Sequence, residues 1–196
     1  KPYELNISWW SAMEDSSRDS KRFQFERFIL TQLLVMALKG VPAFYLPALL
    51  ASENDIKSFS MTGQRRDLNR EKFKLDNLVS VLNNPESNAN KNIKYLGNAM
   101  DIRSKLEQFH PSSEMECLSK GRSDIVVIKR GKGPKSVFAI HNMTENKINY
   151  QLDDYDLPEL IDNDFNMKDF LASTKYNWKN ISLDPFQVIW LGSLMK

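Results

Sequence analysis

The side chains best suited to bind a polar ligand gather in one short part of the chain. Glu53, Asn54 and Asp55 stand in a polar stretch that ends in the adjacent guanidinium groups of Arg65 and Arg66. An arginine offers several donors in a rigid planar fork, and a carboxylate accepts hydrogen bonds through both of its oxygens. Together these groups could form hydrogen bonds and ion pairs with a polar ligand.

This polar stretch follows an apolar run, and that order is typical of an α/β barrel. Gly40 and Pro42 introduce residues 41–46, which are predicted to form a fully buried parallel strand. A helix is expected to begin near Asp67 or Asn69, because either side chain could cap its first turn. Since barrels build their sites in the loops after such strands, any chemistry is expected here.

Helical patterns stand on both sides of this stretch. Residues 21–39 predict a helix that is apolar on nearly all faces, ends at Gly40 and needs packing partners on more than one side. Residues 75–82 carry apolar side chains at i, i+3, i+4 and i+7, which predicts an amphipathic helix. A further helix is expected over residues 88–109.

The sequence changes character near residue 110, where short β-rich runs replace the helical pattern. These runs cover residues 125–129, 136–141, 148–152 and 186–191. A Gly-Lys-Gly-Pro turn at 131–134 separates the first two runs, as in a hairpin. The expected fold class is therefore α/β plus all-β, with barrel elements in residues 1–110 and a small antiparallel β-domain in residues 111–196.

Composition excludes several classes of protein. A net charge of +2 over 196 residues is too small to indicate a nucleic-acid partner. The most apolar run, residues 28–38, is about half the length that spans a bilayer, so no membrane partner is expected. The single cysteine, Cys117, fits a reducing cytoplasm.

No metal site or cofactor is predicted. His110 and His141 stand alone at the ends of predicted elements, and Cys117 is distant from both in sequence. The acidic segment 153–164 lacks the regular ligand spacing and the glycine of an EF-hand loop. The sequence also has no glycine-rich phosphate cradle.

Three motifs stand in the first part of the chain: residues 2–6 (PYELN), residues 40–56 (GVPAFYLPALLASENDI) and residues 62–73 (TGQRRDLNREKF). Together they resemble the sucrose phosphorylase branch of the α-amylase family. The resemblance implies the C-terminal part of such an enzyme, namely the end of a (β/α)8 barrel and the β-domain behind it. One parallel strand cannot close a barrel, so the remaining strands are expected outside this sequence.

The resemblance also implies a reaction. In this branch a carboxylate forms a glucosyl-enzyme intermediate, a second carboxylic acid protonates the leaving group, and inorganic phosphate accepts the glucosyl group. The product is α-glucose 1-phosphate. The family's catalytic acids lie on earlier strands, so the resemblance implies that this chain holds no catalytic residue and is inactive alone.

The resemblance further implies which residues bind substrate. Arg66, with Arg65 beside it, matches the R-x-[IL]-N-R motif whose first arginine hydrogen-bonds hydroxyls of the glucosyl ring. Tyr3 and Glu4 match the loop that lines the acceptor side. Asp55, in the family's Asn-Asp pair, is expected to contact the sugar, to position Arg65 or Arg66, or to cap a turn.

Glu4 departs from the pattern of the sucrose-specific members, which usually carry Gln at the matching position. This difference points to the relatives that act on phosphorylated sucrose, glucosylglycerate or glucosylglycerol. Trp9 and Trp10 are interpreted either as a platform for a sugar ring or as packing residues, and packing is the commoner role of aromatics after a barrel strand.

The expected partners are a sugar substrate and inorganic phosphate. The apolar helix 21–39 would expose large patches, so a homo-oligomer or association with the missing N-terminal barrel half is also expected. A hydrolase or transglucosidase of the same family is one alternative function. Another is a non-catalytic carbohydrate-binding fragment, whose candidate aromatics, Tyr150, Tyr155, Tyr176 and Trp178, show no regular spacing.

Overall fold

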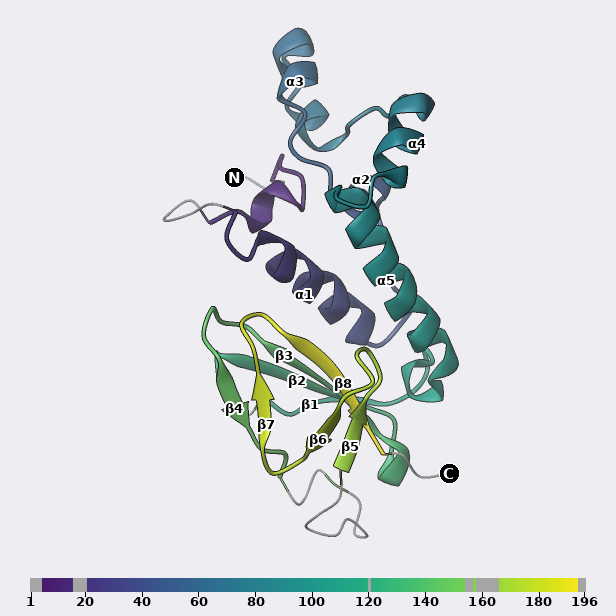
Figure 1. The fold of residues 1–196 in the computed structure, drawn as a ribbon, viewed down its shortest axis with the longest axis vertical. Helices are drawn as coiled ribbons and strands as arrows, with labels where there is room; N and C mark the ends of the chain where they lie inside the picture. The colour runs from purple at the N-terminus through teal and green to yellow at the C-terminus, as the bar shows by residue number, and fades with distance from the viewer. Residues whose placement is uncertain (1–4, 16–20, 120, 154–156, 158–165, 194–196) are drawn as a thin grey trace. The chain divides into compact units, whose positions relative to one another are not determined.

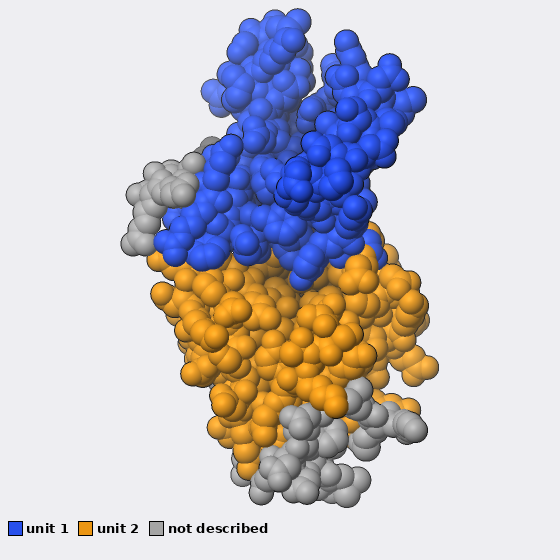
Figure 2. All heavy atoms as spheres, in the orientation of Figure 1, with its two compact units in different colours: residues 1–29, 43–97 blue, residues 30–42, 98–196 orange. Residues whose placement is uncertain are grey.

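The structure is a computed structural model, and it describes residues 5–15, 21–119, 121–153, 157 and 166–193 (Figure 1). The chain divides into two compact units, which Figure 2 shows in different colours. Unit 1 comprises residues 1–29 and 43–97, and unit 2 comprises residues 30–42 and 98–196. The division into domains at residues 110 and 111 stays a prediction.

The helices of the chain agree with the sequence pattern in three places. The predicted helices over 21–39, 75–82 and 88–109 are observed as α1, α4 and α5, the last followed by a short 3-10 turn. The helical elements are η1 (Ser11–Met13), α1 (Gln24–Ala37), α2 (Leu46–Leu49), α3 (Ile56–Thr62), η2 (Arg65–Asn69), α4 (Leu75–Asn83), α5 (Asn88–Lys105), η3 (Glu107–Phe109) and η4 (Gly133–Lys135).

The predicted buried strand over 41–46 is wrong for this chain. Residues 41–45 form no helix and pair with no strand among the described residues, and α2 begins at Leu46 with Pro47 in its first turn. Val41 is 80% exposed and Tyr45 is 56% exposed. A strand needs neighbours that bind its N–H and C=O groups, and a barrel strand without them has no ladder to join.

The helix expected near Asp67 or Asn69 is also wrong. These residues belong to the 3-10 turn η2, and α4 begins only at Leu75. Asp67 does not cap a following helix, because its Oδ2 accepts a hydrogen bond from Thr62 Oγ1 at 2.5 Å. The side chain is therefore used to close the loop behind α3.

Trp10 has a packing role. It is 2% exposed, and its ring meets Phe25 and Phe28 edge to face at centroid distances of 6.4 and 5.3 Å. The Trp10 carbonyl oxygen also accepts a hydrogen bond from Gln24 Nε2 at 3.1 Å. Trp9, by contrast, is 42% exposed.

Unit 2 contains an antiparallel β-domain, as predicted. Within the described residues one sheet has the strand order β1-β2-β3-β8-β5-β6, and β4 pairs with β7 in a second sheet. The strands are β1 (Met115–Cys117), β2 (Ile125–Arg130), β3 (Val137–Asn142), β4 (Ile148–Tyr150), β5 (Asn166–Asp169), β6 (Lys175–Asn177), β7 (Ile181–Leu183) and β8 (Val188–Gly192). All pairings are antiparallel. The turn predicted at 131–134 joins β2 to β3, with Gly131 and Gly133 at positive φ.

The core of unit 2 lies between the inward faces of these strands. Ile125, Val127, Ile128 and Arg130 of β2 and the whole of β3 and β8 are buried, and the side chains that point inward along these strands meet those of their neighbours. The central members of the cluster are Ile125, Val127, Phe138, Ile140, Leu152, Met167, Trp178, Ile181, Leu183, Ile189 and Leu191.

Two arginines of unit 2 fix the end of α1. The last carbonyl groups of a helix lack partners within the helix. Arg130, which is wholly buried, donates to the Ala37 carbonyl at 2.9 Å, and Arg103 donates to the Met36 carbonyl at 2.9 Å and to the Gly40 carbonyl at 3.0 Å. These bonds account for the helix end that the sequence predicts.

The exposed apolar patches from which self-association was predicted are not observed on α1. Helix α1 was expected to expose large apolar patches, but Phe28, Leu33 and Met36 have no exposed surface and only Leu38 near its end is 44% exposed. Unit 1 instead exposes large apolar side chains on its N-terminal segment, on the segment before α2, and on α2, α3, α4 and α5: Leu5, Ile7, Trp9, Tyr45, Leu46, Ile56, Met61, Leu75, Val79, Val81 and Tyr95.

Candidate functional site

Asp55 lies at the start of α3, where its side chain caps the helix. Its Oδ1 accepts a hydrogen bond from the backbone N–H of Ser58 at 2.8 Å. Hydrogen bonds from the Ser58 side chain and from its backbone N–H hold the pKa of the Asp55 carboxyl below its usual range, and the positive charges of Lys57 and Lys72 act in the same direction. The carboxylate is thus ionised at neutral pH and is bonded to the first turn of α3. Of the three roles that the sequence left open for Asp55, this is the capping role.

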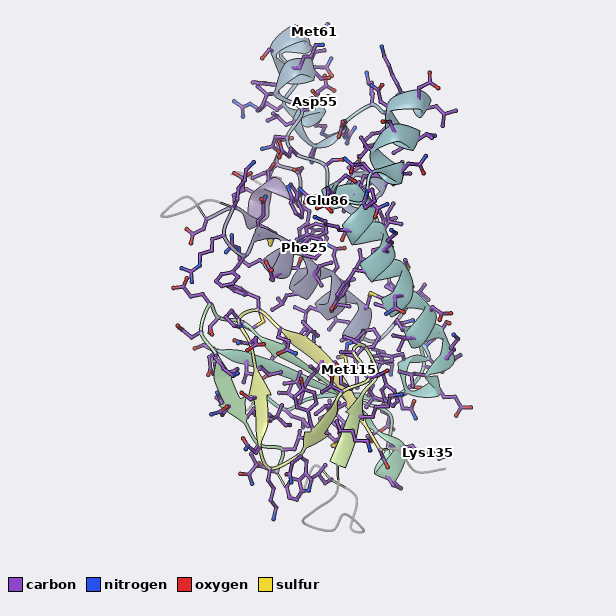
Figure 3. The ribbon with its side chains drawn as sticks, in the orientation of Figure 1. Phe25, Asp55, Met61, Glu86, Met115 and Lys135 are labelled. Carbon is purple, nitrogen blue, oxygen red and sulfur yellow. The ribbon has the colours of Figure 1, made fainter. Side chains whose placement is uncertain are left out.

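The backbone of the same residue ties α3 to η2. The Asp55 N–H donates to the Leu68 carbonyl at 2.8 Å, so the loop folds back on its own start. Helix α3 ends at Gly63, whose φ of 67° lies in the left-handed region that favours glycine. Asp55 and Met61 mark the two ends of this helix in Figure 3. The result is a compact loop from residue 54 to residue 69.

Both candidate arginines lie on η2, and the loop presents them to solvent. Arg65 and Arg66 are exposed, whereas Asp55 is half-buried. The structure thus places Asp55, Arg65 and Arg66 in one local element. Tyr3 and Glu4 lie outside the described residues.

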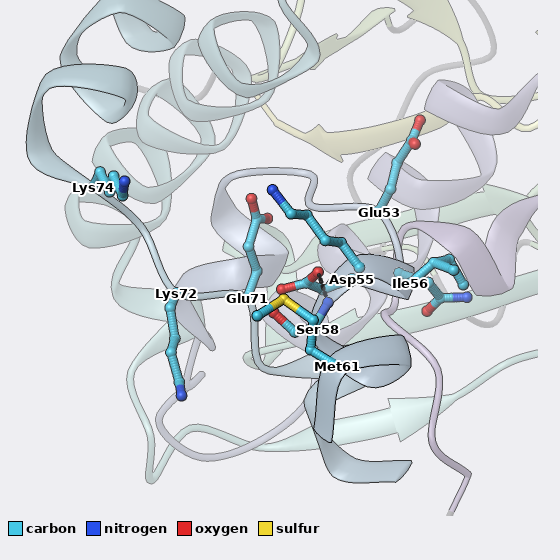
Figure 4. Close-up of a pocket in the computed structure, with 10 residues that line it drawn as sticks. Glu53, Asp55, Ile56, Ser58, Met61, Glu71, Lys72 and Lys74 are labelled. Carbon is cyan, nitrogen blue, oxygen red and sulfur yellow. Dashed lines mark hydrogen bonds between the residues drawn. The ribbon is translucent and has the colours of Figure 1, made fainter. Parts of the chain in front are cut away.

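A pocket of about 680 Å³ opens beside this loop (Figure 4). It is lined by α3 and by the segment 71–74, and Lys57, Lys72 and Lys74 contribute three positive charges. Glu53 and Glu71 also line it, together with Asp55, so the charges balance and the pocket has no net attraction for an anion. Arg65 and Arg66 are not among the described residues that line it.

These three lysines were not predicted as site residues from the sequence. The alternation of Glu71, Lys72 and Lys74 after the arginine motif resembles any solvated charged segment. Lys57 is two positions from Asp55 on α3, and the return of segment 71–74 past the start of α3 brings Lys72 and Lys74 to the same pocket. That return depends on the loop geometry and has no local sequence signal.

Other chemical groups form no further site within the described part of the chain. No group of three or more His, Cys, Asp or Glu side chains could hold a metal there. No described helix has the length and apolar character needed to cross a membrane. The acidic segment 153–164 does not fit the sequence pattern of a calcium loop, and almost all of it lies outside the described residues.

The candidate aromatic side chains of the β-domain that the structure describes do not form an exposed row. Trp178 is 2% exposed and belongs to the core, and Tyr150 and Tyr176 pack against that core. Tyr155 lies outside the described residues. The arrangement of the three described aromatics therefore argues against the carbohydrate-binding alternative.

Comparison with solved structures defines the class of the fold. The structure of AmyP in complex with maltose covers 92% of this chain and 37% of its own, with a TM-score of 0.69 and 17% identity. The trehalose-6-phosphate hydrolase TreA of Bacillus licheniformis covers 96% of this chain and 42% of its own, with a TM-score of 0.63 and 15% identity. The chain shares its fold with part of these α-amylase-family enzymes, which confirms the predicted fold class.

Comparison with curated sequences defines the branch more narrowly. The chain is 29% identical over 145 residues to a glucosylglycerate phosphorylase of Allomeiothermus silvanus, covering 74% of this chain and 26% of the relative. It is 22% identical over 130 residues to a sucrose phosphorylase of Streptococcus mutans, covering 66% of this chain and 24% of the relative. No family model matches the chain.

These relatives confirm the resemblance to the sucrose phosphorylase branch. A glucosylglycerate phosphorylase of Escherichia coli matches over 191 residues at 22% identity, which is 97% of this chain and 32% of the relative. The chain thus spans between about a fifth and a third of the length of the curated relatives it matches. It is similar to the C-terminal part of glucoside phosphorylases.

Proposed function

We propose that the chain is the C-terminal part of a retaining α-glucoside phosphorylase, and that glucosylglycerate is its substrate class. The observation that carries this proposal is the similarity of about three quarters of the chain to a glucosylglycerate phosphorylase. Glu4, which stands where sucrose-specific members usually carry Gln, supports a substrate other than sucrose. The complete enzyme would act in the cytoplasm, which suits a chain with a single free cysteine.

The reaction would proceed in two displacements at the anomeric carbon. A carboxylate from the N-terminal part of the enzyme attacks this carbon, while a carboxylic acid donates its proton to the departing glycerate oxygen. Inorganic phosphate then attacks the glucosyl-enzyme, and the bond to the carboxylate breaks. The product is α-glucose 1-phosphate with the configuration of the substrate retained.

The residues of this chain would bind the substrate and would not break bonds. Arg66 would donate hydrogen bonds to hydroxyls of the glucosyl ring from its exposed position on η2, with Arg65 beside it. Tyr3 and Glu4 would contact the acceptor. Asp55 would act indirectly, because its capping bond to Ser58 and its backbone bond to Leu68 hold the loop in shape.

The N-terminal part of the barrel would cover the apolar side chains that unit 1 exposes. Residues 41–45 belong to no helix and pair with no strand among the described residues, so they would be available to join a parallel sheet. Each large apolar side chain buried in this way would contribute about 1.5–3 kcal/mol. Exposed side chains such as Leu46, Ile56 and Leu75 are the candidates for this contact.

The test is a phosphorolysis assay of the complete polypeptide. Glucosylglycerate, glucosylglycerol, sucrose and sucrose phosphate are each supplied with inorganic phosphate, and α-glucose 1-phosphate is measured. Glucosylglycerate should give the highest kcat/KM, and the product should disappear when phosphate is omitted. Release of free glucose at the same rate without phosphate would identify a hydrolase instead.

A further inference from the structure

A single hydroxyl group bonds both residues that flank the two candidate arginines. Thr62, the last residue of α3, accepts the backbone N–H of Gln64 on its Oγ1 at 3.1 Å, and the same Oγ1 lies 2.5 Å from Asp67 Oδ2. Gln64 and Asp67 also bond to each other, because the Asp67 N–H donates to the Gln64 carbonyl at 3.0 Å. Arg65 and Arg66 are the two residues between them. The three bonds enclose the arginine pair, and we call them the Thr62 clamp.

The hydroxyl proton of Thr62 has two acceptors within reach. The Ser58 carbonyl oxygen lies 3.1 Å away, at the i−4 position that serine and threonine hydroxyls in helices commonly bond. Asp67 Oδ2 is nearer, and hydrogen bonds from a hydroxyl to a carboxylate are shorter and stronger than those to a neutral oxygen. The proton therefore belongs to the bond with Asp67.

The clamp holds the start of η2, whereas a different bond holds its end. The Asp55 N–H donates to the Leu68 carbonyl at 2.8 Å, and since this bond joins two backbone groups it would remain in a variant without the Thr62 hydroxyl. No residue of α3 or η2 is buried, so core packing does not fix the start of the turn. Loss of the hydroxyl should therefore loosen the part of the turn that carries Arg65 and Arg66 and leave the loop closed.

We propose that Thr62 is a positioning residue that acts through Arg66. Its hydroxyl fixes the start of η2, so that the Arg66 guanidinium meets the glucosyl ring in the geometry that the reaction needs. The proposal rests on the proposed function, in which Arg66 binds that ring. A guanidinium donates from a rigid planar fork, so a shift of the backbone that carries it misaligns several hydrogen bonds at once.

The experiment is a double-mutant cycle in the complete polypeptide, with kcat/KM for the phosphorolysis of glucosylglycerate as the measured quantity. T62V keeps the branched shape of the side chain and removes the hydroxyl. It should lower kcat/KM about fivefold in the wild type, a typical effect of one lost hydrogen bond. In the R66A background it should change kcat/KM less than about twofold, because the residue through which it acts is already absent. Equal losses in both backgrounds would overturn the inference.

Two further variants separate the clamp from other effects on α3. T62S keeps the hydroxyl and should stay within about twofold of the wild-type kcat/KM. S60A is the matched control, since Ser60 is also exposed on α3 and donates to its own i−4 carbonyl, that of Ile56, at 2.8 Å. It removes the same kind of helix bond without touching the clamp and should leave kcat/KM unchanged. A loss in S60A as large as that in T62V, or a T62S enzyme as impaired as T62V, would contradict the positioning role.

Exchange of the Gln64 amide hydrogen with water tests the clamp without a catalytic assay. In T62V this amide loses its acceptor and should exchange at least about twofold faster, while T62S and S60A keep the wild-type rate. Unchanged exchange in T62V would overturn the clamp itself. Faster exchange with an unchanged kcat/KM would overturn the positioning role alone. A wild-type enzyme that forms no α-glucose 1-phosphate, with faster exchange in T62V, would overturn the proposed function and the role of Thr62 in it.

Discussion

His141 makes the stability of the β-domain depend on pH in a defined range. The residue lies on β3 with no exposed surface, and its Nδ1 lies 3.3 Å from the Val126 carbonyl oxygen. Its Nε2 has no hydrogen-bond partner among the described residues. Burial lowers the pKa of His141 from 6.5 to about 4, because the charged ring would lose its hydration. The ring is therefore neutral in the folded protein at pH 7.

The direction of the effect follows from proton binding. Between pH 6.5 and about 4 the unfolded chain binds a proton at His141 that the folded chain does not bind. The free energy of unfolding therefore falls as the pH falls through this range. At 1.36 kcal/mol for each pH unit, the full loss amounts to about 3 kcal/mol.

The assay is urea-induced unfolding at pH 7.0, 6.0, 5.0 and 4.5, comparing wild type with H141F. Carboxylates also titrate in this range, but they do so in both proteins, so the difference between the two slopes isolates His141. The loss of stability between pH 7 and 4.5 should be about 2–3 kcal/mol smaller in H141F. H110F, which removes the exposed histidine, is the matched control. Parallel curves for wild type and H141F would refute a buried neutral histidine at this position.

Three further substitutions test other parts of the structure. R66A in the complete enzyme should lower kcat/KM for phosphorolysis at least about tenfold, whereas R70A on the same loop should change it less than about threefold; equal effects would remove Arg66 from the site. R130M should lower the free energy of unfolding by about 3 kcal/mol, since it leaves buried carbonyls without donors. The exposed R122M, measured in the same urea series, should cost under about 1 kcal/mol. D55A should destabilise by about 0.5–2 kcal/mol through loss of the α3 cap, and an unchanged midpoint would contradict that role.

The sequence predicts those elements whose stability comes from nearby residues. Helices α4 and α5 follow from the spacing of apolar side chains, and β2, β3 and β8 follow from runs of β-branched and aromatic residues bounded by turns. Strands β1, β5, β6 and β7 were missed, because each has only three or four residues and exists through its neighbour. Their pattern is too short to distinguish from a loop.

The candidate site likewise contains features that the sequence predicts and features that it does not. The motif that contains Arg66 could be recognised from the sequence, and the capping role of Asp55 was among the roles expected. The bonds of Asn54 to Ser8 and Ser11 could not be predicted, because they join residues more than forty positions apart and require the folded path of the chain between them. The pocket lysines depend on the same kind of long-range return.

This contrast between local and distant bonds also explains how a part of a barrel can carry a formed binding loop. The loop from Asp55 to Asn69 is closed by bonds between residues at most thirteen positions apart, so it needs no barrel to take its shape. The segment 41–45 pairs with no strand among the described residues, and its Val41 and Tyr45 are exposed, so it would need other strands to form a sheet. In the proposed enzyme, the bonds within the loop would hold the turn that carries Arg66, and the remaining barrel would supply the reacting carboxylates.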